Sequence, residues 1–62
     1  MTEEEHKARA MLLGGMWGRR SNCYRIPPKP GGWSSTYYDA DTMEELTYEQ
    51  WETRVDIGMR RL

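Results

Sequence analysis

The sequence has a single cysteine, Cys23, and a single histidine, His6. One thiol cannot form a disulfide within the chain, and a tetrahedral zinc site needs about four ligands drawn mostly from cysteine and histidine. A chain of 62 residues without such cross-links is near the lower size limit for a domain that folds independently. We therefore expect no disulfide scaffold, no metal site and no cofactor.

Long apolar runs are also missing. The longest, AMLL at residues 10–13, is far below the ~20 residues that a membrane-spanning helix needs. The first nine residues, MTEEEHKAR, are charged where a secretory signal would be apolar. Because a lone thiol also suits a reducing compartment, we expect a cytoplasmic protein with no membrane partner.

The chain contains no phenylalanine, and hydrophobic residues make up only 37% of it. So thin a core supplies roughly 3–5 kcal/mol in a domain of this size, and tryptophan and tyrosine must provide much of the packing. The composition thus favours a surface for a partner or for self-association, with a homodimer as one alternative.

Acidic residues are absent from residues 14–38. Residues 17–38 carry four basic side chains, whereas residues 39–56 carry seven acidic side chains and one basic side chain. One interpretation is that the two halves neutralise each other across the fold or across a dimer. The other is that the basic half faces an acidic partner. The four basic residues are Arg19, Arg20, Arg25 and Lys29.

A first helix is expected over residues 3–13. Thr2 and Glu5 have the spacing of a capping box, and Gly14 and Gly15 form the usual C-terminal stop. We expect the apolar positions of this helix to be buried and its histidine, in the first turns, to be solvated. These apolar positions are Ala8, Met11 and Leu12.

A second helix is expected over residues 48–61. Thr47 and Gln50 form another capping box, and Leu46 and Trp51 occupy the two positions of a hydrophobic staple. Apolar residues then recur at three- and four-residue steps, which predicts that this helix carries the core. The stripe consists of Tyr48, Trp51, Val55, Met59 and Leu62.

Between the helices, residues 22–26 and 33–38 have the alternation and aromatic content of strands, and PPKPGG separates them. This pattern predicts an antiparallel hairpin over residues 22–38, with a brief extra strand at residues 43–46 as an alternative. The expected fold is a single α+β domain over residues 1–62, in the order α-β-β-α, with the hairpin packed on both helices.

Motifs that would support catalysis are weak. Residues 14–21, GGMWGRRS, lack the spacing and the strand–loop–helix context of phosphate-binding loops, so we interpret them as a flexible exit from the first helix. Cys23 and His6 have no third residue that would orient them as a nucleophile and base. The acidic segment lacks the central glycine of an EF-hand. We predict a non-enzymatic protein with no catalytic residues.

The feature that indicates a function is a cluster of aromatic and basic residues. Trp, Tyr and Arg dominate interface hot spots, and the same residue types stack on bases and contact phosphates. Some of the rings must also serve the core. The predicted partner-binding residues are Trp17, Arg19, Arg20, Tyr24, Arg25, Lys29, Trp33 and Tyr37.

These features predict a small protein-protein interaction module or inhibitor that binds a macromolecular partner through the hairpin. Short accessory proteins of phages and mobile elements often have this profile, which is an association only. The alternative is a nucleic-acid-binding protein that uses residues 17–38, with an affinity that falls steeply with salt. The acidic second helix argues against this alternative because it would repel a phosphate backbone.

Overall fold

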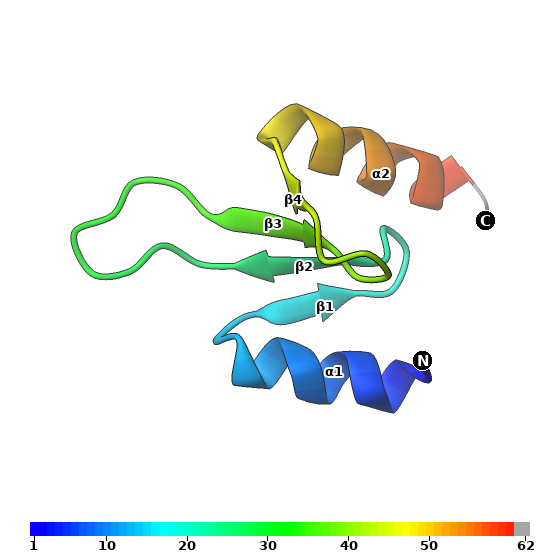
Figure 1. Cartoon of the computed structure of the whole chain (residues 1–62). Helices are drawn as coiled ribbons and strands as arrows, with labels where there is room; N and C mark the ends of the chain where they lie inside the picture. Colours follow the sequence, from blue (N-terminus) through cyan, green and yellow to red (C-terminus); the bar gives the residue numbers. More distant parts are fainter. Residues whose placement is uncertain (61–62) are drawn as a thin grey trace.

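Four antiparallel strands form one sheet, in which they lie in chain order, and a helix stands at each end of the chain (Figure 1). This computed structural model describes residues 1–60. The predicted α+β class is confirmed, although there are two more strands than in the α-β-β-α order. Arg61 and Leu62, the ends of the predicted helix and of its apolar stripe, lie outside the described residues. The elements are α1 (Glu3–Leu12), β1 (Met16–Gly18), β2 (Cys23–Ile26), β3 (Thr36–Asp39), β4 (Glu45–Leu46) and α2 (Tyr48–Arg60).

Helix α1 begins and ends where the local sequence predicts. The Thr2 hydroxyl accepts the Glu5 N–H, and the Glu5 carboxylate accepts the Thr2 N–H, which completes a capping box. At the other end, Gly14 and Gly15 donate their N–H groups to carbonyls of the last helical turn. Gly14 has a φ of 80°, the left-handed conformation that this C-terminal motif requires and that glycine adopts without steric cost.

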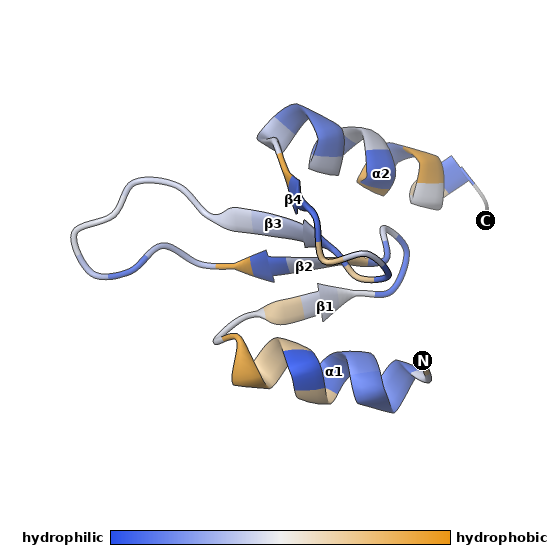
Figure 2. Cartoon of the chain, viewed as in Figure 1, coloured by the Kyte–Doolittle hydropathy of each residue, from blue (hydrophilic) through white to orange (hydrophobic). Residues whose placement is uncertain are grey.

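The buried side of α1 is not the predicted one. His6 and Ala10 are buried, whereas Ala8, Met11 and Leu12 are exposed, the last two to 78% and 89%. The apolar residues at the end of the helix, coloured orange in Figure 2, are therefore exposed. The prediction of a solvated histidine is wrong because the sheet presents a tyrosine hydroxyl and a tryptophan ring to it, while the small Ala10 side chain lets the helix approach closely.

Strand β1 lies in the segment that the sequence indicated as a flexible helix exit. It pairs antiparallel with β2, and Trp17 stands opposite Tyr24. In the connecting turn, Asn22 has a φ of 51° and its N–H donates to the Gly18 carbonyl at 2.8 Å. A strand of three residues is too short to show an alternating sequence pattern. It is recognised as a strand only because it pairs with β2.

The predicted hairpin of β2 and β3 is confirmed, but β3 begins at Thr36 and not at residue 33. The last pair is Ile26 with Thr36. Pro27 and Pro28 come next on β2 and have no N–H to donate, so the ladder ends there. Residues 27–35 consequently form a loop that projects from the sheet (Figure 1). The alternative of an extra strand near residue 46 is also confirmed, by β4.

The two helices pack on opposite faces of the sheet. On the α1 face, Tyr24 is buried with Ala10 and Ala40, and Trp17, Tyr38 and Met43 pack around them. On the α2 face, Cys23, Tyr37 and Leu46 are buried and Trp51 packs against them. Adjacent residues of a strand point to opposite faces, and this alternation separates the two clusters.

Helix α2 begins at the predicted capping box, in which Thr47 and Gln50 exchange bonds between side chain and backbone. Its expected role as the carrier of the core is wrong. Among its described residues only Gly58 is buried, whereas Tyr48 and Met59 are 58% and 51% exposed. The strand tyrosines form the core instead, and the Trp51 ring stacks on one of them, Tyr37, with centroids 4.5 Å apart.

Candidate functional site

The eight predicted partner-binding residues fall into separate places. Tyr24 and Tyr37 are 0% and 7% exposed, so their rings serve the core of the sheet. Trp17 is half-buried on the α1 face. The remaining five side chains are exposed: Arg19, Arg20, Arg25, Lys29 and Trp33.

Trp17 is held by internal contacts. Its ring stacks on His6, with centroids 5.0 Å apart and 15° between the planes. The indole Nε1 donates to Asn22 Oδ1 at 3.2 Å, and Asn22 Nδ2 donates in turn to Asp41 Oδ2 at 2.9 Å. Trp17 thereby joins α1, the β1–β2 turn and the β3–β4 turn.

His6 and Cys23 lie on opposite faces of the sheet. His6 Nδ1 is hydrogen-bonded to the Tyr24 hydroxyl at 2.9 Å, on the α1 face. The neighbouring Cys23 is buried on the α2 face, and its thiol donates to the Ser21 carbonyl. Burial raises the pKa of this thiol. The sheet thus separates the two side chains that the sequence offered as a nucleophile and base, and residues 1–60 contain no group of three or more potential metal ligands.

A hollow of about 530 Å³ lies between the β1–β2 hairpin and α2. We call it the basic groove. Its floor and walls are largely apolar, and three of the predicted partner-binding arginines line it. The lining residues used below are Met16, Arg19, Arg20, Arg25, Trp51, Val55 and Met59.

Two of these arginines are held over the apolar part of the groove. The Arg25 guanidinium carbon is 5.9 Å from the centroid of the Trp51 ring, within the range of a cation–π interaction. Arg20 Nη1 donates to the Met59 sulfur at 3.0 Å. The basic groove therefore combines positive charge with an apolar surface.

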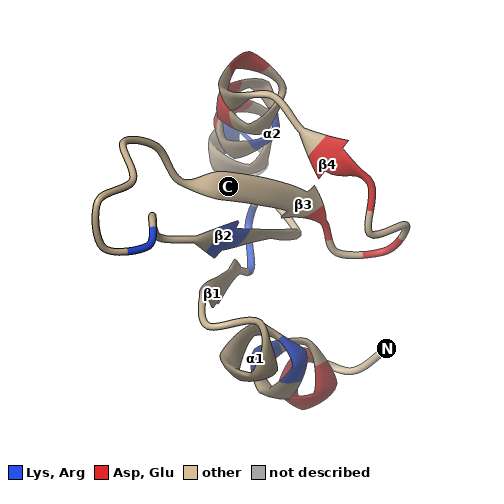
Figure 3. Cartoon of the chain, turned by 60° about the vertical axis from the view of Figure 1, so that its left-hand side comes forward, with Lys and Arg blue, Asp and Glu red and all other residues tan. Residues whose placement is uncertain are grey.

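The acidic half of the chain does not neutralise these arginines through direct ion pairs. In Figure 3, acidic residues (red) lie on β4, on the turn before it and on α2, whereas β2 carries a basic residue (blue). Within residues 1–60, none of the four basic residues of segment 17–38 forms an ion pair. The three ion pairs of this part of the chain are Lys7–Glu3, Arg54–Asp39 and Arg60–Asp56. Neutralisation across a dimer and an external acidic partner remain as the two interpretations.

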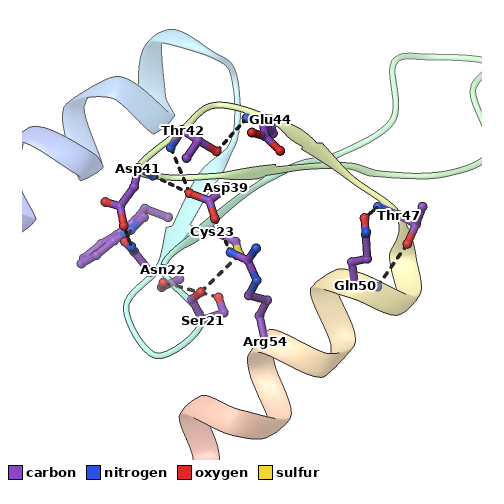
Figure 4. A network of polar contacts seen from close by, with 12 residues as sticks. Ser21, Asn22, Cys23, Asp39, Asp41, Thr42, Glu44, Thr47, Gln50 and Arg54 are labelled. Carbon is purple, nitrogen blue, oxygen red and sulfur yellow. Dashed lines mark hydrogen bonds and ion pairs between the residues drawn. The ribbon is translucent and has the colours of Figure 1, made fainter.

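One acidic residue, Asp39, has a structural role (Figure 4). One carboxylate oxygen accepts the N–H groups of Asp41 at 2.8 Å and Thr42 at 3.0 Å, and the other is paired with Arg54. The hydrogen bond from Arg54 lowers the pKa of Asp39 to about 2, and the same bond raises the pKa of Arg54. The pair fastens α2 to the end of β3.

The loop of residues 27–35 presents the most exposed aromatic ring, Trp33, which is 98% exposed. The loop contains all three prolines of the chain. A turn precedes the tryptophan, in which the Gly32 N–H donates to the Lys29 carbonyl at 2.7 Å and Gly31 has a φ of 89°. Beside the basic groove, this fully exposed indole is the second surface feature of the protein.

Comparison of the chain with protein-family models, with curated proteins and with solved structures found no match in any of the three. Among the helices of residues 1–60, none combines the length and the apolar character needed to cross a membrane. The case for a function therefore rests on two surface features, the basic groove and the exposed Trp33.

Sequence reasoning missed two features that shape the basic groove. Met16 and Met59 expose 75% and 51% of their surface beside the arginines, although Met59 belongs to the apolar stripe that was expected to be buried. Gly58 lies against the Arg20 backbone, where a Cβ atom would overlap the carbonyl group. A glycine inside an otherwise regular helix was the one signal of such an approach.

Proposed function

We propose that this chain is a non-enzymatic protein-interaction module that binds a protein partner through the loop of residues 27–35, with Trp33 as the anchor. The observation that supports the proposal is the 98% exposure of Trp33. Tryptophan contributes more binding energy than most residues when it enters a pocket of a partner. With almost all of its surface exposed on this loop, the indole contributes no packing to the fold of residues 1–60.

The three prolines of the loop favour binding. Prolines restrict the unbound loop, so that less conformational freedom is lost when a partner orders it. The loop carries Lys29 and no acidic residue, which favours a pocket bordered by carboxylates. If that pocket is the cleft of an enzyme, the module acts as an inhibitor. A cytoplasmic location is part of the proposal, since a lone thiol suits a reducing compartment.

The test compares three tagged proteins in capture experiments from an extract of the natural host: the parent, Trp33→Ala and Leu12→Ala. Leu12 is the matched control because it is 89% exposed on α1. We expect the parent and Leu12→Ala to retain one protein partner after nuclease treatment. Trp33→Ala should bind that partner at least about 30-fold more weakly, the loss typical of a hot-spot residue, and its melting temperature should not change.

Two outcomes would contradict the proposal. Trp33→Ala could retain the partner with unchanged affinity, which would remove the indole from the interface. Alternatively, nuclease could release everything that the parent captures, which would favour the nucleic-acid-binding alternative that the sequence left open.

A further inference from the structure

The surface around α2 has opposite charges on the two sides of an apolar row. Val55 and Met59 line the basic groove, and they also line a neighbouring hollow of about 320 Å³. Glu52 and Asp56 line this second hollow, and among residues 1–60 no basic residue does. The row of Val55 and Met59 therefore lies between an arginine side and a carboxylate side.

This arrangement is complementary to itself. In a dimer with twofold symmetry the same patch occurs on both subunits, and every contact occurs twice. If the axis runs along the apolar row, the arginine side of each copy meets the carboxylate side of the other. We propose that the basic groove and the acidic side of α2 together form a homodimer interface, in which a second copy of this chain covers the Val55–Met59 row.

The arginines and carboxylates of the patch have no strong partners within the subunit, which supports a second copy of this chain as the occupant. The arginines of the groove form no ion pair within residues 1–60, so their charge is available to carboxylates from outside the subunit. Glu52 forms no ion pair in this part of the chain either, and Asp56 pairs only with Arg60, in an exposed contact at 3.3 Å. Such an exposed pair is weak, and it can be exchanged for a partner's arginine at little cost.

The apolar part of the patch gives the dimer a further driving force. Met16 and Met59 are 75% and 51% exposed, and Val55 and Trp51 are only partly buried. Covering these side chains would add buried apolar surface to a domain whose own core is thin. This inference does not depend on the Trp33 loop, which is not part of the patch.

The test is a pair of charge reversals studied by analytical ultracentrifugation over a range of protein concentrations. Arg19→Glu/Arg20→Glu makes both sides of the patch acidic, and Glu52→Arg/Asp56→Arg makes both sides basic. We expect the parent to sediment as a dimer that dissociates at high salt, because salt screens these pairs. Each double variant alone should be a monomer, with a dimer dissociation constant raised at least about 100-fold.

Mixing the two double variants provides the decisive measurement. In the mixture, the acidic patch of one variant faces the basic patch of the other, so a heterodimer should form again. This restoration also shows that both variants are folded. The matched control, Lys7→Glu/Lys29→Glu, makes the same change in net charge outside the patch and should remain a dimer.

A parent chain that stays monomeric up to about 1 mM, the affinity of a very weak complex, would overturn the proposal. So would a dimer that both double variants retain, or a mixture that fails to associate. If the monomeric parent instead bound an acidic peptide or an oligonucleotide through the groove arginines, a different occupant would replace the second copy.

Discussion

The two faces of the sheet are completed in different ways. On the α1 face, the helix closes over Tyr24, and the buried polar group there, the His6 imidazole, has a hydrogen-bond partner and a stacked ring. On the α2 face, the helix covers Tyr37 and Cys23 but leaves a hollow of about 530 Å³ lined by arginines. The α1 face is therefore fully covered, whereas the α2 face has an open groove beside its core.

The difference shows how a short chain divides its few large side chains. The α1 face uses tyrosine, tryptophan and histidine in one hydrogen-bonded cluster, which leaves none of them for a partner. The α2 face holds its helix by the Asp39–Arg54 pair and by one close backbone approach at Gly58. Because a groove stays open beside the core of the α2 face, methionines and arginines remain accessible there.

The largest difference between the faces should appear on truncation of one aromatic residue from each. Tyr24→Ala removes a fully buried ring and should cost about 3–5 kcal/mol of unfolding free energy. Trp51→Ala removes a half-buried ring and should cost about 2 kcal/mol. Chemical denaturation of dilute protein measures both. If Tyr24→Ala does not fold, Tyr24→Phe, which leaves His6 without its partner, should still cost about 1–3 kcal/mol. Equal losses for Tyr24 and Trp51 would contradict the comparison.

Gly58→Ala tests the backbone approach that positions α2. At an exposed helical site this change would stabilise the protein by about 1 kcal/mol. Here the new Cβ would overlap the Arg20 carbonyl oxygen and lie 2.6 Å from its carbon, so we expect a net loss of about 1–3 kcal/mol. Thr53→Ala, at an exposed position of the same helix, is the control and should not destabilise. A stabilised Gly58→Ala protein would show that α2 does not contact this turn.

Acid should destabilise the packing of α2 on the sheet because it protonates Asp39. The pKa of this carboxyl is about 2 in the folded protein, below its ordinary value of 3.8, so the unfolded chain binds the proton first. The pair therefore stabilises the fold above about pH 4, and this stabilisation is lost as the pH falls toward 2. Thermal melts between these pH values should show a smaller decrease for Asp39→Asn, which retains the acceptor for the turn. An identical decrease in both proteins would remove Asp39 as the cause.

The smallest effect is expected at Cys23. Its thiol is a small buried group, so Cys23→Ala should cost about 1 kcal/mol or less and leave partner binding unchanged. Because burial raises the pKa of the thiol, the folded parent should react slowly with thiol reagents, and denaturant should accelerate the reaction. Rapid labelling of the folded protein would place Cys23 at an accessible part of the groove.

Local signals predicted the ends of the elements well. Both capping boxes, the glycine stop after α1 and the two strands beside the proline-rich segment are present. Each of these signals acts within a few residues of the chain. The start of β3 at Thr36 also has a local cause, since Pro27 and Pro28 cannot extend the ladder.

The burial of side chains was predicted less well. Tyr48 and Met59 of the predicted α2 stripe and the apolar positions of α1 are exposed, while His6, the polar exception, is buried. Periodicity identifies a helix and its faces, but a hydrogen bond to a distant tyrosine decides which face turns inward. The candidate site shares this limit: Tyr24 and Tyr37 are among the predicted partner-binding residues, but they lie on opposite faces of the sheet and a helix covers each face, which the sequence does not show.

The sequence by itself determined the α+β class, the caps, the proline-rich loop and the separation of basic from acidic segments, because these depend on neighbouring residues or on composition. Only the tertiary structure decided that Trp33 projects from the loop, that three arginines line a groove, and that Glu52 and Asp56 lie across an apolar row from them. Those facts depend on how α2 lies against the sheet. That placement is held by contacts between residues far apart in the chain, the Asp39–Arg54 pair and the approach of Gly58 to Arg20.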